Sequence, residues 1–353
     1  MAPHRWLRTA LLALPLLLPA GASAESPPAF LLAFGTYGFA PGQLNWPRGV
    51  AVDPAGTSVY VANSANDRVE KFTATGSWVL GFGGYGTGPG QFKQLIGIAC
   101  DAAGNVYAAD WLDGRIEKFT AEGAFLAQWG SNGAGPGQFG HPEGIAVNRA
   151  VQVLYVADYD HDRIERFTLD GAFLGQWGAS GTGDGQFHGP SGIAVNGLGE
   201  VLVTDSGNNR VQKFGAAGAF LGKWGSTGTG DGQFSNPDGI AVDALGAVYV
   251  VDGYHDRVEA FAADGTFRSQ WGQHGSAPGD FNGPEGIAVG PDGRIYCTDH
   301  WNERIQEFGS VAIVPMLPPT SAPWVAAALA VLGASAVRRR SGVRGPTHTP
   351  PER

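Results

Sequence analysis

The stretch from Gly137 to Gly178 reads GQFGHPEGIAVNRAVQVLYVADYDHDRIERFTLDGAFLGQWG, and five further copies of this pattern run through the chain. The initial glycine recurs at a spacing of 47 or 48 residues, at Gly42, Gly90, Gly137, Gly185, Gly232 and Gly279. A unit of this length with four short strand-like runs is typical of a propeller blade, because one small sheet cannot bury both faces alone. The pattern therefore predicts an all-β fold, a six-bladed β-propeller of four-stranded blades.

Each copy contains four runs that read as strands. The first, Gly144 to Val147, is almost wholly apolar, which predicts a strand buried on both faces and nearest the axis. The others are Leu154 to Asp158, Arg163 to Phe167 and Phe173 to Trp177. Connections alternate between the two ends of a propeller. The loops before the first strand and between the second and third strands therefore share one face, the loop face, and the tight turns share the other, the turn face.

The stretch Val203 to Phe214, VTDSGNNRVQKF, matches the core signature of the NHL repeat, and the region from Phe30 to Phe308 resembles the NHL-repeat family of β-propellers. The resemblance implies one of three roles, since the family includes RNA-binding regulators, metal-dependent amidating lyases and exported bacterial binding proteins. Two departures are mild. Asn63 replaces the aspartate of the other copies, and Lys93 to Ile96 lacks the usual proline.

The sixth copy stops at Phe308 without a fourth strand. A segment before the first copy, Phe30 to Gly35, has the character of the fourth strand Phe125 to Gly130. We therefore expect the N-terminal strand to close the last blade, so that no open edge remains between the first and last blades.

The N-terminus predicts export. Residues 1–24 read as a signal peptide, with Arg5 and Arg8 before an apolar run from Leu11 to Leu18 and small residues before Glu25. The propeller is expected to occupy residues 25–310. We expect an exported protein, extracellular or associated with the cell envelope.

Three segments follow the propeller: a Pro-rich linker (residues 311–323), an apolar segment with an arginine cluster (324–340) and a disordered tail (341–353). The apolar run is shorter than the ~20 residues that span a bilayer. However, a Val-Pro motif, an apolar run and arginines in this order resemble bacterial sorting signals, which predicts membrane attachment through this segment. The alternative is a tail that is disordered throughout.

The net charge of the chain argues against a nucleic-acid partner. The chain has 23 Lys and Arg against 32 Asp and Glu, a formal net charge of −9, and residues 25–310 hold 16 of these basic residues against 31 acidic ones. Nucleic-acid binding depends on neutralising phosphates. We therefore expect no nucleic-acid partner.

The loop face holds the long loops, where binding residues concentrate. Its candidate binding residues are Trp111, Tyr159, His161, Tyr254, His255, His300 and Trp301. Polar residues gather on loops in any case, and a zinc site needs three or four converging ligands, which the spacing does not show. We predict no cofactor, and the presence of a metal, zinc or calcium, stays open.

An aspartate and an arginine flank the hairpin between the second and third strands of most copies. These pairs are Asp110 with Arg115, Asp158 with Arg163, Asp205 with Arg210, Asp252 with Arg257 and Asp299 with Arg304. Their repetition favours a structural role, with charge-assisted hydrogen bonds that fix the loop. A ring of arginines that binds an anion is the alternative.

No catalytic constellation is visible, so no catalytic residue is assigned. The leading hypothesis is a non-catalytic exported scaffold whose loop face binds a protein or carbohydrate partner. The rival is a metal-assisted lyase or hydrolase resembling the amidating lyases or lactonases of propeller fold, which would need histidines and carboxylates meeting at the central opening.

Overall fold

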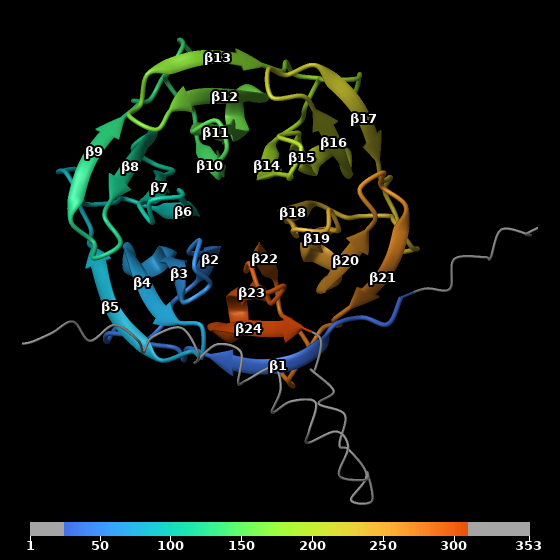
Figure 1. Cartoon of the computed structure of the whole chain (residues 1–353), viewed down its shortest axis with the longest axis horizontal. Helices are drawn as coiled ribbons and strands as arrows, with labels where there is room; N and C mark the ends of the chain where they lie inside the picture. The colour runs from blue at the N-terminus through green and yellow to red at the C-terminus, as the bar shows by residue number, and fades with distance from the viewer. Residues whose placement is uncertain (1–24, 310–353) are drawn as a thin grey trace, which may run out of the picture. The chain divides into compact units, whose positions relative to one another are not determined.

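The computed structural model describes residues 25–309, which form six four-stranded antiparallel sheets. Figure 1 shows these sheets arranged as blades around a central axis, as the repeat predicts. The predicted signal peptide and the three predicted C-terminal segments lie outside the described residues, as does the proposed membrane attachment. Among residues 25–309, no helix is long and apolar enough to cross a membrane.

The first three blades follow the repeat in order. Blade 1 comprises β2 (Pro47–Val52), β3 (Ser58–Asn63), β4 (Arg68–Thr73) and β5 (Trp78–Gly83). Blade 2 comprises β6 (Leu95–Cys100), β7 (Val106–Asp110), β8 (Arg115–Phe119) and β9 (Phe125–Trp129). Blade 3 comprises β10 (Pro142–Asn148), β11 (Val153–Asp158), β12 (Arg163–Thr168) and β13 (Phe173–Trp177).

The other three blades complete the ring. Blade 4 comprises β14 (Pro190–Val195), β15 (Val201–Asp205), β16 (Arg210–Phe214) and β17 (Phe220–Trp224). Blade 5 comprises β18 (Pro237–Val242), β19 (Val248–Asp252), β20 (Arg257–Phe261) and β21 (Phe267–Trp271). Blade 6 comprises β22 (Pro284–Val289), β23 (Ile295–Asp299), β24 (Arg304–Gly309) and β1 (Ala29–Phe34).

Short 3-10 turns follow the second strand of five blades. They are η1 (Ser64–Asn66), η2 (Tyr159–His161), η3 (Ser206–Asn208), η4 (Gly253–His255) and η5 (His300–Asn302). The residue after each turn has a left-handed backbone, as Asn209 does with φ of 53°. These turns direct loop-face side chains towards the axis or the rim.

The N-terminal strand closes the ring, as predicted. Strand β1 pairs antiparallel with β24, with Phe30 opposite Phe308 and Phe34 opposite Ile305. The Phe30 and Phe308 rings meet edge to face at a centroid distance of 6.0 Å. Blade 6 therefore has four strands like the other blades, with β1 as its outer strand and β24 paired on both sides.

The hydrophobic core lies between neighbouring blades. One cluster joins Phe139 and Phe167 of blade 3 to Tyr107 and Trp129 of blade 2. The Trp129 ring also covers Gly171, whose φ of +87° and closeness to that ring (2.7 Å from a built Cβ) both exclude a side chain. Each fourth strand thus packs on the next blade.

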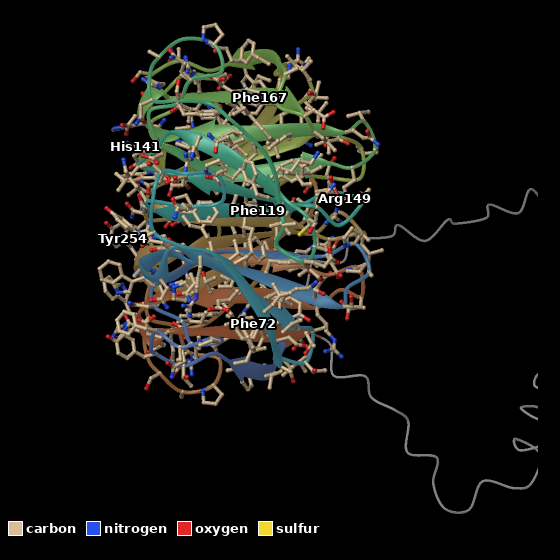
Figure 2. All side chains as sticks on the ribbon, turned by 90° about the vertical axis from the view of Figure 1, so that its left-hand side faces the viewer. Phe72, Phe119, His141, Arg149, Phe167 and Tyr254 are labelled. Atoms are coloured by element: carbon tan, nitrogen blue, oxygen red, sulfur yellow. The ribbon has the colours of Figure 1, made fainter. Side chains whose placement is uncertain are left out.

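The two faces carry different side chains. Figure 2 shows His141 and Tyr254 at one edge of the propeller and Arg149 at the opposite edge, with Phe119 and Phe167 between them. His141 and Tyr254 belong to the loop face and Arg149 to a tight turn of the turn face. The alternation of connections predicted from the repeat is therefore present.

Candidate functional site

Six dipeptides bring one variable side chain from each blade to the axis. They are Arg48-Gly49, Ile96-Gly97, Glu143-Gly144, Ser191-Gly192, Asp238-Gly239 and Glu285-Gly286. Each lies at the start of a first strand, where the strand pairing is irregular. Together they line a narrow neck of the central channel, with a volume of about 70 Å³.

The glycines of this neck are required by close backbone approach. A Cβ on Gly144 would lie 2.1 Å from the carbonyl oxygen of Ser191, and one on Gly97 would lie 2.0 Å from that of Glu143. Each blade therefore presses its first strand against the backbone of the next, which only glycine permits. This packing fixes the variable side chains in a ring at the axis.

A cavity of about 270 Å³ lies at the loop-face mouth of the channel. Its lining residues are Arg48, Trp111, Glu143, Tyr159, Ser191, Ser206, Asn236, Asp238 and Glu285. Five of the six ring positions thus contribute to the cavity, and two aromatic side chains and a serine come from the loops after second strands. The cavity is polar, with an aromatic side.

Three carboxylates and one guanidinium set the charge of this cavity. Arg48 Nε lies 3.3 Å from Glu285 Oε2. Burial raises the pKa of Glu285 to about 8 and that of Asp238 to about 6, although Arg48 opposes both shifts. Burial, followed by the charge of Asp238, raises the pKa of Glu143 well above its usual range. Of the three, Glu285 therefore retains its proton at neutral pH.

His300 stands behind Glu285 and is only 2% exposed. Its Nδ1 lies 3.3 Å from Glu285 Oε1, and its ring stacks on Trp46 at 5.8 Å and meets Trp301 edge to face at 4.6 Å. Burial and the nearby Arg48 lower the pKa of His300 to about 4. The imidazole is therefore neutral at pH 7 and adds no charge to the mouth.

Trp111 and Tyr159 form the aromatic side of the cavity. The indole of Trp111 stacks on His141 with ring centroids 3.8 Å apart and an angle of 18°. The Nδ1 of His141 lies 2.5 Å from Asp160 Oδ2, which holds the stacked pair in place. Tyr159 begins η2 and is partly exposed. Both side chains were predicted as binding candidates, and both line the cavity.

The other predicted candidates do not line this cavity. His161 and His255 turn back to the hairpin aspartates, with Nδ1 2.8 Å from Asp158 and 2.7 Å from Asp252. Tyr254 is exposed on the rim. His300 and Trp301, with Trp46, form an aromatic group beside the cavity.

Every predicted hairpin pair lies within ion-pair distance. The shortest N···O distances are 3.4 Å for Asp110–Arg115, 3.0 Å for Asp158–Arg163, 2.7 Å for Asp205–Arg210, 2.9 Å for Asp252–Arg257 and 2.7 Å for Asp299–Arg304. The arginines also donate to loop carbonyl groups of the same blade's long loop. Blade 1 differs, because Asn63 replaces the aspartate. Arg68 still pairs with Glu70 at 2.5 Å, as Arg163 pairs with Glu165 at 2.6 Å.

Metal binding would need several ligands in one place. Across residues 25–309, no group of three or more His, Cys, Asp or Glu side chains is arranged to hold a metal ion. Histidines of the loop face instead contact separate carboxylates, as His161 contacts Asp158, His255 contacts Asp252 and His300 contacts Glu285. Both cysteines, Cys100 and Cys297, are buried free thiols.

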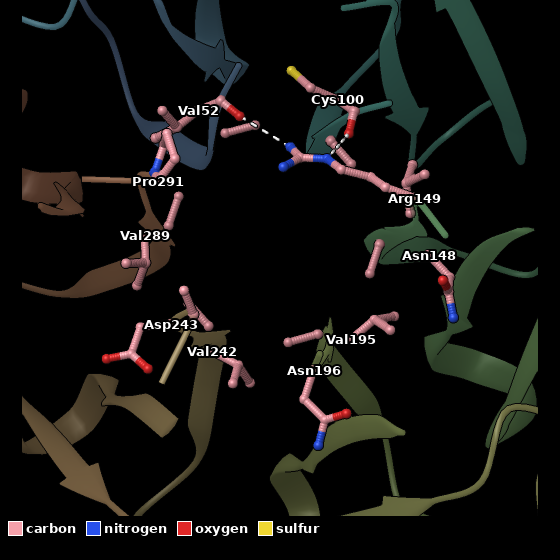
Figure 3. A pocket seen from close by; sticks show the side chains of 18 of the residues that line it. Val52, Cys100, Asn148, Arg149, Val195, Asn196, Val242, Asp243, Val289 and Pro291 are labelled. Carbon is pink, nitrogen blue, oxygen red and sulfur yellow. Dashed lines mark hydrogen bonds between the residues drawn. The ribbon is translucent and has the colours of Figure 1, made fainter. Parts of the chain in front are cut away.

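The opposite end of the channel is wider and less charged. Its vestibule has a volume of about 500 Å³, and Figure 3 shows Val195, Val242 and Val289 around it. Arg149 reaches across from blade 3 and donates to the carbonyl oxygens of Cys100 (3.2 Å) and Val52 (3.3 Å). The arginine is therefore already hydrogen-bonded to backbone, and the other polar side chains of the vestibule include Asn148, Asn196 and Asp243.

Sequence reasoning missed the axial ring. The binding candidates predicted from the sequence do not include Arg48, Glu143, Asp238 or Glu285. A signal existed, because the residue before the repeated glycine of the first strand takes five different identities in the six copies. A position that varies next to an invariant glycine at the axis is where a propeller can change its specificity.

Comparison with known proteins agrees with this architecture. Residues 187–214 and 281–308 match the NHL repeat. The protein is a six-bladed β-propeller, and it carries NHL repeats. No curated protein sequence matches it.

Several solved structures share the fold. A catalytically inactive virginiamycin B lyase from Staphylococcus aureus, with quinupristin, is 14% identical, with a TM-score of 0.54 over 75% of this chain and 80% of that one. A gluconolactonase from Xanthomonas campestris is 18% identical, with a TM-score of 0.56 over 75% and 87%. A nidogen/laminin complex contains a chain 20% identical, with a TM-score of 0.53 over 69% and 85%. At these identities the likeness concerns the fold alone.

Proposed function

We propose that this protein is an exported, non-catalytic binding scaffold whose loop face receives a protein or carbohydrate partner. The observation that carries the proposal is the gathering of exposed aromatic side chains on that face. They are Tyr37, Phe39, Trp46, Tyr85, Tyr159, Tyr254 and Trp301. Tyr and Trp dominate the binding energy of protein interfaces, and their flat rings also stack on sugars. Export rests on the pattern of residues 1–24.

The rigidity of the face supports this role. The long loops that carry Tyr37 and Tyr85 are tied by backbone hydrogen bonds, such as Gly38 to Leu44 and Gly86 to Phe92, both 3.0 Å. The hairpin arginines donate to carbonyls of equivalent loops. A partner therefore meets a surface that is already ordered, which reduces the entropy lost on binding. The likeness to a nidogen/laminin complex is consistent with a fold that binds other proteins.

The test compares loop-face and turn-face variants of the full chain. Tyr254→Ala with Trp301→Ala removes two exposed aromatics of the loop face, and Leu198→Ala with Leu245→Ala removes two exposed apolar residues of the turn face. Binding is measured on a glycan array and by photo-crosslinking to cell-surface proteins identified by mass spectrometry. We expect the loop-face variant to lose about tenfold or more in affinity and the turn-face variant to bind normally. Equal binding by the two variants would contradict the proposal.

A metal-assisted lyase or hydrolase is the second candidate. Carboxyl groups with strongly raised pKa values in a central cavity, as at Glu143 and Glu285, favour it, because such groups cluster at active sites. The likeness to a lyase and a lactonase is consistent with it. Elemental analysis of the purified protein decides between the two, since stoichiometric zinc or calcium that survives dialysis would favour the enzyme.

A further inference from the structure

We propose that the axial cavity at the loop-face mouth binds a primary ammonium group, with Glu143 and Asp238 as its counter-charges and Trp111 and Tyr159 as its aromatic walls. This inference goes beyond the scaffold function and holds whether or not the rim binds a macromolecule. It follows from the charge, shape and unsatisfied polar atoms of the cavity.

The ring of axial side chains has an excess of acid. Glu143, Asp238 and Glu285 come from blades 3, 5 and 6. Among residues 25–309, Arg48 is the cationic side chain in the cavity lining. Arg48 lies against Glu285 at 3.3 Å. Among residues 25–309, neither Glu143 nor Asp238 has an ion pair within 4.0 Å. Glu143 and Asp238 are partly buried, and carboxylates withdrawn from water without a counter-charge are costly, so this site favours an added cation.

In the free protein, bound protons reduce the negative charge of these carboxyl groups. The pKa values of all three carboxyl groups are raised, first by burial, and Asp238 further raises those of Glu143 and Glu285. An ammonium group that enters the cavity would supply the positive charge and release protons from the carboxyl groups. Binding of the cation is therefore linked to proton release.

The aromatic walls suit an organic cation. Trp111 is held by its stacking on His141 at 3.8 Å, and His141 is held in turn by Asp160. A cation near the face of Trp or Tyr gains electrostatic attraction from the ring, and more when it is desolvated. A preorganised wall loses little entropy on binding. These features distinguish the cavity from an acidic patch that binds inorganic ions.

The shape of the cavity restricts how a ligand enters and how large it can be. The glycine neck below the cavity is only about 70 Å³, whereas the cavity itself is about 270 Å³. A ligand therefore enters from the loop face, with its ammonium group towards the carboxylates. Ser206 and Asn236 supply further polar groups along the lining. The volume suits a small amine or the end of a lysine side chain.

Two buried nitrogens next to Glu285 lack a hydrogen-bond partner, and of the two residues Arg48 belongs to the cavity lining. They are Nδ1 of His300, which is 2% exposed, and Nε of Arg48, each 3.3 Å from an oxygen of Glu285 but without hydrogen-bond geometry. Buried polar groups in folded proteins are rarely left in this state. The Glu285 side of the cavity is thus incomplete in the free protein, as expected where a ligand rearranges the carboxylate.

The test is isothermal titration of the full chain at pH 8 with three probes: 1-pentylamine, Nα-acetyl-lysine methylamide and the neutral 1-pentanol. The key variant is Glu143→Gln with Asp238→Asn. The matched control, Asp184→Asn with Asp231→Asn, makes the same charge change at exposed residues outside the cavity lining. Thermal melting of each variant verifies folding.

We expect at least one of the two amines to bind with a stoichiometry of one and about tenfold or more tighter than 1-pentanol. The Gln/Asn variant should lose about tenfold or more in amine affinity, and the control should bind normally. Trp111→Leu should weaken binding by about three- to thirtyfold. The preferred amine shows whether the ligand is a free small molecule or a lysine of a protein.

The proposal is overturned if neither amine binds tighter than 1-pentanol, or if the Gln/Asn variant binds the amine as well as the wild type. It is also overturned if calcium binds there and the amines do not. Because Tyr254 and Trp301 lie outside the cavity lining, the loop-face variant Tyr254→Ala with Trp301→Ala tests the scaffold function separately from this site.

Discussion

Replacing Arg210 with alanine removes a side chain that joins three parts of one blade. Its Nε donates to Asp205 Oδ2 at 2.7 Å, Nη1 donates to the carbonyl of Thr182 at 2.7 Å, and Nη2 donates to those of Gly183 and Gln186 at 2.8 Å. The arginine thus ties the long loop before blade 4 to the hairpin between β15 and β16. Alanine leaves all four acceptors without this donor.

The expected cost follows from burial and from the remaining partners. Arg210 is 7% exposed, and removing one partner of a buried charge pair costs about 3–5 kcal/mol. A simple sum over four charge-assisted bonds, at about 1.5–3 kcal/mol each, would exceed this value. That sum overestimates the loss, because in the alanine variant Asp205 still accepts hydrogen bonds from Gln212 Nε2 at 3.0 Å and from Asn208 Nδ2 at 2.9 Å. We therefore expect a loss of about 3–5 kcal/mol.

The assay is urea unfolding of the full chain. Arg268→Ala is the control, because Arg268 is more exposed and its one ion pair, with Glu25, is 3.5 Å long. That variant should stay within about 0.5 kcal/mol of the wild type. Arg210→Lys should recover only part of the loss, since an ammonium group cannot reproduce the planar fork. A loss below about 1 kcal/mol for Arg210→Ala would show that the hairpin pairs are not structural.

Three further predictions concern closure, the neck and the cavity. Deletion of residues 28–35 removes β1 and should lower the melting temperature sharply, whereas an unchanged melting curve would contradict closure by this strand. Gly144→Ala should lower the free energy of unfolding in urea by about 1–3 kcal/mol, because the new Cβ would lie 2.1 Å from a backbone oxygen. The control Gly222→Ala, whose Cβ would meet no atom within 4 Å, should be neutral or slightly stabilising. The pKa of Asp238 is raised to about 6, so the folded state binds the proton more tightly than the unfolded state. The stability contributed by this proton is present at low pH and lost as the pH rises from about 4 to about 6. Asp238→Asn should therefore gain about 3 kcal/mol over the wild type across that window, and parallel pH profiles of the two proteins would refute the shift.

The blades were predictable because their physical demands repeat. The glycine of each tight turn and the aromatic of each fourth strand recur together, as at Gly171 and Trp129, since the ring covers the glycine of the next blade. Even the departure at Asn63 carried information. Asn63 keeps a loop contact of the aspartate that it replaces, because its Oδ1 accepts a hydrogen bond from the Asn45 N–H at 2.7 Å.

The site was less predictable because it depends on the closed ring. Arg48 and Glu285 are far apart in sequence and meet only because blades 1 and 6 are neighbours. Residues chosen by type alone, such as His161 and His255, are held by aspartates of their own hairpins. Nothing in the local sequence distinguishes them from Trp111, whose position depends on a histidine of the next blade.

The pairing of β1 with β24 determines how the ring responds to mechanical load. Ala29 and Gly309 lie opposite each other at one end of this antiparallel pair, so the chain enters and leaves the propeller side by side on the turn face. Tension applied through both ends would pull along the direction of the interstrand hydrogen bonds and break them one after another. Blade 6 would then unzip from its outer strand at low force, while the five blades formed from contiguous sequence stay intact.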